Sequence, residues 1–182
     1  MGRVIIFPTD TVYGIGTSIY DVDSINRIYE IKKRPLDKKL ACLCADFNQI
    51  ESIAVANESA KKLINKFLPG ALTVILKTKE DIKEKIGYDT IGVRIPNHQI
   101  ALDILNENGP MLTTSVNESG NVPLNEYDEI VKEYNDLVDE IYNTNTESSN
   151  ISSTVVLAID EIKILRLGEI SEAEILACLK NE

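Results

Sequence analysis

A short apolar run near the N-terminus ends in a polar, glycine-containing segment, and this junction constrains the fold more than any other. Val4, Ile5 and Ile6 are β-branched and favour a buried strand. Pro8 has no amide hydrogen, so strand pairing should stop there. Residues 9–16 (Thr-Asp-Thr-Val-Tyr-Gly-Ile-Gly) are therefore predicted to form an exposed turn, whose glycines allow a sharp bend or the close approach of a ligand. Ordinary strand exits have the same composition, so a binding loop and a simple turn both fit this segment.

The rest of the chain alternates apolar runs of strand length with amphipathic helical patterns. The predicted strands are 40–45, 71–76, 90–95, 111–114, 137–142, 153–159 and 162–165. The predicted helices begin after Asp21 or Asp23, after Asp46 and at Pro96, or lie within 60–67, 125–134 and 171–179. Because strands and helices mix throughout and two strands follow each other near the C-terminus, we expect an α/β fold with a twisted, mixed sheet. The length predicts one domain over residues 1–182.

Composition limits the classes of function. A net charge of −10 argues against a broad electrostatic grip on nucleic acid, although a local basic cleft is compatible with it. No apolar run approaches the roughly 20 residues that span a bilayer, and no signal pattern opens the chain, so we expect a cytoplasmic protein with no membrane partner. Cys42, Cys44 and Cys178 lack metal-site spacing and the chain has one histidine, so we expect reduced core thiols and no protein metal site.

Cationic residues gather at one place and interrupt a strand at another. Residues 32–34 (Lys-Lys-Arg) and 38–39 (Lys-Lys) form a basic cluster, which fits either a solvated helix end or a grip on phosphate groups. Arg94 lies inside the apolar run 90–95. It fits an edge strand that faces solvent, or else it must find a carboxylate, a phosphate or water, because burying it unpaired is costly.

A second polar strand exit runs from Ser115 to Gly120 (Ser-Val-Asn-Glu-Ser-Gly). Ser115 and Asn117 would face the same side of an extended chain, where a hydroxyl and an amide can contact a ligand, but the composition also fits a turn. Residues 143–152 form a polar loop that we expect to be flexible unless a ligand orders it. His98, in the first turn of a predicted helix, fits a structural role better than a catalytic one.

In their order along the chain, these segments resemble the motifs of the YrdC-like family, whose best characterised members are threonylcarbamoyl-AMP synthases. The matching segments are 8–14, 32–35, 69–70 with 72–73, 93–96 with His98, 114–120 and 153–155. Each motif is weak by itself, but their ordered combination is specific. The resemblance implies a twisted open sheet with flanking helices around a deep concave cleft. It also implies synthesis of threonylcarbamoyl-AMP and pyrophosphate from L-threonine, bicarbonate and ATP with Mg²⁺, for the threonylcarbamoyladenosine modification of tRNA.

The resemblance further implies roles for individual residues. Lys32 and Arg34 would hold the phosphates and act in catalysis. Their side chains would point to the same side only if the chain is extended there. Arg94 would pair with the threonine carboxylate. The other ATP-binding residues would be Lys38, Thr90, Ser115, Asn117 and Arg166, and the other threonine-binding residues Thr11, Thr113 and Ser153. Because the substrates supply both nucleophile and leaving group, positioning and charge neutralisation would suffice for catalysis.

Some features depart from the family pattern or leave other functions open. Leu43 stands where many longer relatives have a histidine, and the chain matches the minimal, single-domain form of the family. Expected partners are downstream enzymes that transfer the threonylcarbamoyl group to tRNA, and a weak local contact with RNA. The alternatives are an RNA-binding or ribosome-associated module without synthase activity, or a related carbamoyl transfer on the same fold. Within the synthase hypothesis, Thr11 should face the amino acid, Gly14 and Gly16 should shape the cleft wall, and Asp10 should be structural or water-mediated.

Overall fold

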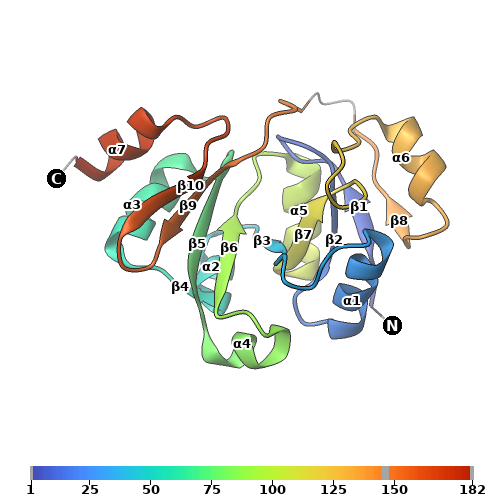
Figure 1. Cartoon of the computed structure of the whole chain (residues 1–182), viewed down its shortest axis with the longest axis horizontal. Helices are drawn as coiled ribbons and strands as arrows, with labels where there is room; N and C mark the ends of the chain where they lie inside the picture. Colours follow the sequence, from blue (N-terminus) through green and yellow to red (C-terminus); the bar gives the residue numbers. More distant parts are fainter. Residues whose placement is uncertain (1, 145–147, 181–182) are drawn as a thin grey trace.

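The computed structural model describes residues 2–144 and 148–180, which form a mixed sheet flanked by helices (Figure 1). The strands are β1 (Ile5–Phe7), β2 (Gly14–Ser18), β3 (Ala41–Leu43), β4 (Ala54–Val55), β5 (Leu72–Thr78), β6 (Thr90–Arg94), β7 (Met111–Ser115), β8 (Glu140–Ile141), β9 (Thr154–Ala158) and β10 (Ile162–Arg166). The helices are α1 (Val22–Ile31), α2 (Phe47–Ile53), α3 (Glu58–Phe67), α4 (Glu80–Ile86), α5 (Gln99–Asn108), α6 (Tyr127–Tyr134) and α7 (Glu172–Lys180). The predicted α/β class is confirmed.

The strands follow the order β10-β9-β5-β6-β3-β7-β2-β1-β8, and β4 pairs with β5 outside this path. Three pairs, β1 with β8, β3 with β6 and β5 with β9, are parallel, and the other pairs are antiparallel. The sheet is therefore mixed, as the sequence predicts. The N-terminal strands with α1 lie at one end of the molecule, and β10 with α7 lies at the other (Figure 1).

Side-chain caps explain where several helices begin. The carboxylate of Asp21 accepts a hydrogen bond from the Ser24 amide at the start of α1, and Asp46 caps α2 in the same way. Capping by Asp satisfies an amide that has no partner within the helix. Helix α4 ends at Gly87, whose φ of 72° lies in the left-handed region that glycine adopts readily. Helix α4 and the short strand β4 were not predicted.

The segment after Pro8 differs from its prediction in two ways. Thr9 and Thr11 are buried, so the turn is not exposed. Gly14 and Gly16 belong to strand β2, which pairs with β7, instead of forming a bend. A Cβ atom at Gly16 would lie 2.6 Å from Thr113 Oγ1, so the missing side chain allows β7 to approach closely. The local sequence resembles a turn because its glycines are needed for contact with a distant strand.

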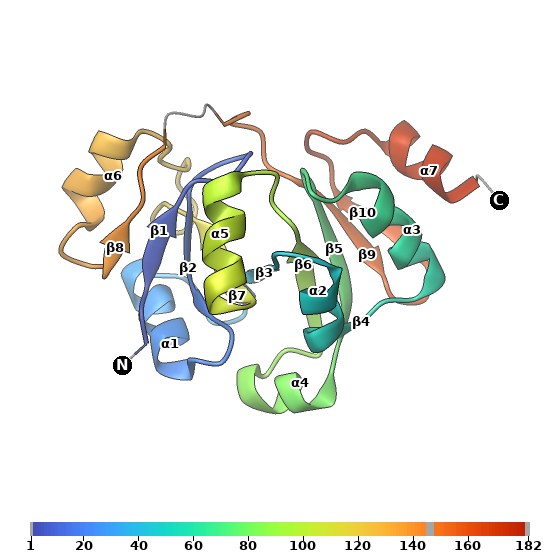
Figure 2. The same cartoon turned by 180° about the vertical axis from the view of Figure 1, so that it is seen from behind.

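Two hydrophobic clusters form the core. The larger one joins α1, α2 and α3 to the sheet through residues such as Ile28, Ile53, Leu63 and Val93. The smaller one packs α5 against residues of β1, β3 and β7, and its members include Leu43. Helices α2, α3 and α5 lie in front of the strands in Figure 2.

Two further expectations concern the burial of the cysteines and the absence of a membrane-spanning segment. Cys42 and Cys44 are free and buried, as predicted, whereas Cys178 is only half-buried. Burial raises the pKa of the Cys42 thiol, so it stays protonated. None of the described helices is long and apolar enough to cross a membrane.

Candidate functional site

A pocket of about 410 Å³ lies on one face of the sheet. Its lining includes Ala41 and Leu43 of β3, Thr73 and Ile75 of β5, Thr90, Gly92 and Arg94 of β6, and Thr113 and Ser115 of β7. Within each strand these residues alternate, so they point to the same side. Thr114 of β7 also lines the pocket and departs from this alternation. The register places Gly92 opposite Ile75, Arg94 opposite Leu43 and Thr113 opposite Ala41. A strand-by-strand alternation thus builds a single surface, whereas the depth of the expected cleft stays a prediction.

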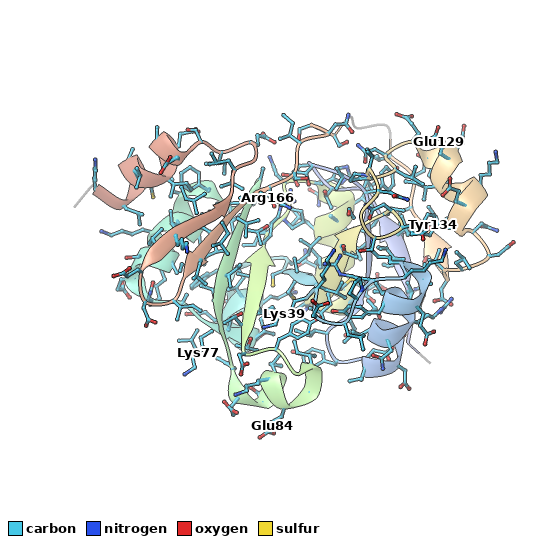
Figure 3. All side chains as sticks on the ribbon, in the orientation of Figure 1. Lys39, Lys77, Glu84, Glu129, Tyr134 and Arg166 are labelled. Carbon is cyan, nitrogen blue, oxygen red and sulfur yellow. The ribbon has the colours of Figure 1, made fainter. Side chains whose placement is uncertain are left out.

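The charge of the pocket is opposite to that of the whole chain. Arg34, Lys39, Arg94 and Arg166 line it, and its described lining contains no aspartate or glutamate. The polar remainder consists of hydroxyl groups: Thr9, Thr11, Tyr13, Thr73, Thr90, Thr113, Thr114, Ser115, Ser152 and Ser153. Figure 3 labels two of the cations, Lys39 before β3 and Arg166 at the end of β10. In a protein of net charge −10, such a lining favours an anionic ligand.

Arg94 is held at the centre of this surface. Strand β6 lies between β5 and β3, so the edge-strand interpretation of Arg94 is wrong. The side chain is buried, and its Nη2 donates to Asp10 Oδ1 at 2.5 Å and its Nη1 to Thr11 Oγ1 at 2.8 Å. Its Nε donates to the carbonyl oxygen of Gly70 at 2.9 Å. Burial lowers the pKa of Arg94, and the charge of Asp10 opposes that shift.

Lys32 and Arg34 diverge in the structure. Lys32 keeps helical geometry at the end of α1 and Lys33 has a φ of 47°, so the extended chain that the spacing argument required is absent here. Arg34 lines the pocket, and its guanidinium donates to the carbonyl oxygens of Lys38 and Lys39. Lys32 has no exposed surface and does not belong to the pocket lining. Its expected phosphate contact therefore stays a prediction that this arrangement does not display.

The ammonium group of Lys32 fixes the turn that follows β7. It donates to the carbonyl oxygen of Ser115, and to the carbonyl oxygen and side-chain Oδ1 of Asn117 at 2.8 and 2.6 Å. The Lys32 carbonyl accepts from the Ser119 amide at 2.9 Å. Burial, with a smaller effect of the nearby Arg34 charge, lowers the pKa of Lys32 to about 7. The end of β7, which presents Ser115 to the pocket, is thus anchored on a buried lysine.

The predicted site residues separate into two groups. Those in the pocket lining are Thr11, Arg34, Thr90, Arg94, Thr113, Ser115, Ser153 and Arg166. Those outside it are Lys32, Lys38 and Asn117. The Asn117 amide oxygen accepts from both Lys32 and Ser115 Oγ, so the asparagine supports the turn from within. The structure thus gathers eight of the predicted residues in one pocket.

The pocket lining also contains Thr73 and Lys39, to which the sequence analysis assigned no role in binding. Thr73 Oγ1 lies 2.8 Å from Ser153 Oγ, and Arg166 Nη2 donates to the Ser153 carbonyl oxygen at 2.8 Å. Thr73 belongs to the matching segment 72–73, but nothing in the local sequence distinguishes it from an ordinary strand threonine. Lys39 lines the pocket whereas its neighbour Lys38 does not, and adjacent lysines are indistinguishable by composition.

Part of the polar loop 143–152 packs on the turn that follows β1. The amide of Ser149 donates to the Asp10 carbonyl oxygen at 2.9 Å, and the amide of Asn150 donates to that of Thr11 at 3.0 Å. The predicted flexibility falls partly on residues 145–147, which lie outside the described residues. His98 is buried and not part of the pocket lining, and burial lowers its pKa.

Known proteins resemble this chain over most of its length. The sequence profile of the Sua5, YciO and YrdC family, described as telomere recombination, matches residues 1–168. A Methanocaldococcus jannaschii protein, provisionally named threonylcarbamoyl-AMP synthase, is 38% identical over 168 residues, or 92% of this chain and 80% of that protein. The threonylcarbamoyl-AMP synthase of Bacillus subtilis is 35% identical and aligns with 97% of this chain and 53% of that protein. The crystal structure of Pyrococcus abyssi Sua5 complexed with L-threonine superposes with a TM-score of 0.90 at 31% identity, over 98% of this chain and 54% of that one. The chain therefore spans about half the length of the last two relatives.

Proposed function

Because this chain belongs to the Sua5, YciO and YrdC family, we propose that it is a threonylcarbamoyl-AMP synthase. It would convert L-threonine, bicarbonate and ATP into threonylcarbamoyl-AMP and pyrophosphate, for the threonylcarbamoyladenosine modification of tRNA. One observation carries the proposal. The pocket brings together three arginines and a lysine without a carboxylate in its described lining, which suits one substrate with a carboxylate and another with a triphosphate.

The chemistry needs no nucleophile from the protein. The threonine amine adds to the carboxyl carbon of bicarbonate with loss of water, and an oxygen of the resulting carbamate attacks the α-phosphorus of ATP. Pyrophosphate leaves with the electron pair of the broken P–O bond. The task of the protein is to align the carbamate with the phosphorus and to neutralise phosphate charge in a site poor in water.

The geometry suggests how the pocket divides between the substrates. Arg94 would bind the carboxylate of threonine, and the neighbouring hydroxyl groups of Thr11, Thr113 and Ser153 would surround the amino acid. Arg34, Lys39 and Arg166 would neutralise the phosphates, while Thr90 and Ser115 contact the nucleotide. Lys32 and Asn117 would support this half of the site through the turn that presents Ser115.

Further parts of the proposal concern the groups that accompany the substrates. Mg²⁺ would enter with ATP, bound by its phosphates, because the described residues contain no cluster of three metal-ligating side chains. The adenylate would pass to downstream tRNA-modifying enzymes, with at most a weak local contact between this chain and RNA. We also propose that the chain acts as one domain in the cytoplasm.

Release of pyrophosphate tests the proposal. Purified protein with ATP, Mg²⁺ and bicarbonate should release pyrophosphate only when L-threonine is added, and chromatography should detect the adenylate. Arg34→Met should reduce turnover at least tenfold. Arg27→Met is the matched control, because Arg27 forms a surface ion pair with Asp139 and does not line the pocket. Release that does not depend on threonine would refute the synthase proposal, and tight, salt-resistant binding of tRNA without turnover would favour the RNA-binding alternative.

A further inference from the structure

The hydrogen bonds of Arg94 leave part of its guanidinium free. The group has five N–H bonds, and three are used by Gly70, Thr11 and Asp10. One N–H on each terminal nitrogen has no hydrogen-bond partner among the described residues. A carboxylate can accept from both terminal nitrogens at once only if the plane of the guanidinium is fixed. Whatever fixes that plane therefore decides how well Arg94 receives a carboxylate.

Asp10 is the only ion-pair partner of Arg94 within the described part of the chain. Its side chain is 18% exposed, and it does not belong to the pocket lining. The backbone of Asp10 is itself held, because its carbonyl oxygen accepts from the Ser149 amide at 2.9 Å. The carboxylate thus contacts Arg94 without belonging to the pocket lining, and a hydrogen bond holds the backbone that carries it.

The partners of Arg94 differ in what they can fix. The Gly70 carbonyl holds Nε and so anchors the inner end of the guanidinium. Thr11 Oγ1 also lies 3.2 Å from Thr9 Oγ1, so its hydroxyl is shared between two neighbours. The ion pair with Asp10, at 2.5 Å, is charge-assisted and therefore the strongest of the three contacts.

We propose that Asp10 is a positioning residue for the amino-acid substrate: it orients the guanidinium of Arg94 so that the two free N–H groups receive the substrate carboxylate. The inference rests on the proposed function, because it assigns Arg94 to the carboxylate of threonine. In this arrangement Asp10 does not contact the substrate and acts on it only by orienting Arg94. A loss of Asp10 should weaken the handling of threonine and leave the handling of ATP nearly unchanged.

Three variants test the inference. Asp10→Ala removes the ion pair, and Asp10→Asn keeps an oxygen acceptor of the same shape without the charge. Asp139→Asn is the matched control, because Asp139 forms an ion pair with Arg27 at the surface, away from the pocket lining. Steady-state pyrophosphate release gives the KM for L-threonine and for ATP. Nitrogen NMR of the Arg94 guanidinium in the ligand-free protein reports whether rotation of its terminal nitrogens is restricted.

We expect Asp10→Ala to raise the KM for threonine at least tenfold and the KM for ATP less than twofold, with Asp10→Asn between it and the wild type. The Arg94 signals should be resolved in the wild type and in Asp139→Asn, and averaged in Asp10→Ala. Equal increases of both KM values, or an unchanged threonine KM, would overturn the inference. If Asp10→Ala does not fold, Asp10→Asn provides the test: its KM for threonine should rise more than its KM for ATP. A wild-type protein without threonine-dependent turnover would refute the proposed function instead, and the NMR comparison alone would then decide whether Asp10 orients Arg94.

Discussion

The ammonium group of Lys32 donates hydrogen bonds to both the carbonyl oxygen and the side-chain oxygen of Asn117, at 2.8 and 2.6 Å, in the interior of the protein. Its third N–H bond is taken by the carbonyl oxygen of Ser115. A buried lysine whose donors are all used by protein oxygens ties the end of α1 to the turn after β7. Lys32 therefore supports, from outside the pocket, the part to which we assign the nucleotide.

Lys32→Met is expected to lower the free energy of unfolding by about 2 kcal/mol. The substitution takes a donor away from three buried oxygen acceptors, of which only Asn117 Oδ1 keeps a second side-chain donor, Ser115 Oγ. The removal of a buried charge, which is itself costly, offsets only part of that loss. Urea denaturation measures the change. Lys61→Met is the control, because Lys61 forms a surface pair with Glu58 that contributes at most about 1 kcal/mol. Equal effects of the two substitutions would contradict the anchoring role.

The stability of the protein should depend on pH through the same lysine. The pKa of Lys32 falls to about 7 in the folded protein, whereas an unfolded lysine titrates near ~10.4. Between these values the unfolded chain binds one proton more, so the free energy of unfolding rises with pH. The cost of burying the charged amine is fully present below about pH 7 and disappears towards about pH 10.

The wild type should therefore gain up to about 1.4 kcal/mol per pH unit relative to Lys32→Met across this window. Urea denaturation of both proteins at several pH values between 7 and 10 gives the comparison. Parallel pH profiles would show that the three oxygen acceptors keep Lys32 protonated throughout the window.

The elements that the sequence predicts best are those whose local residue pattern indicates a buried strand or a capped helix. The runs that became β5, β6 and β9 are apolar and β-branched, and Asp21 and Asp46 are caps by residue type and spacing. The family resemblance, which the ordered motifs carried, is confirmed by the match over residues 1–168. Local chemistry and chain order were therefore sufficient for the fold class and the family.

The failures occurred where a distant part of the chain decides the structure. Strand β2 contains two glycines because Thr113 of β7 lies against it, and no local signal distinguishes that from a turn. Lys32 stands in a basic run that fits a solvated helix end or a grip on phosphates, yet the end of β7 and the turn after it supply enough acceptors to bury it. The pairing of Arg94 with Asp10 joins residues 84 positions apart, and neither position reveals the other by sequence alone.

Gly16→Ala tests the contact between β2 and β7. A Cβ atom there would lie 2.6 Å from Thr113 Oγ1 and 3.2 Å from the Leu112 carbonyl oxygen, so the substitution should cost about 1–3 kcal/mol of stability. Removing the threonine side chain relieves the first clash. The cost of Gly16→Ala should therefore be smaller by about 1 kcal/mol in a Thr113→Ala background, as measured by a double-mutant cycle in urea. Strict additivity would mean that β7 does not require the glycine.

Asn125 connects three segments at the edge of the pocket. Its Oδ1 accepts from the Tyr13 amide at 2.9 Å, and its Nδ2 donates to Ser148 Oγ and to Asn150 Oδ1. The side chain thereby joins the turn after β1 to the segment that leads to the pocket residue Ser152. Asn125→Ala should loosen that segment, because it removes the side-chain hydrogen bonds from Asn125 to both sides.

Hydrogen exchange of the ligand-free protein measures the release. In Asn125→Ala, the amides of Ser149 and Asn150, which donate to the carbonyl oxygens of Asp10 and Thr11, should exchange at least tenfold faster than in the wild type. The core strand β5 should keep its protection. Asn135→Ala serves as the control, since the Asn135 side chain is exposed and contacts only the adjacent Asp136 among the described residues. Because the released segment continues to Ser153, which lies beside Thr73, the same variant should also raise the KM for threonine. Unchanged exchange at Ser149 and Asn150 would show that the backbone hydrogen bonds alone hold the segment.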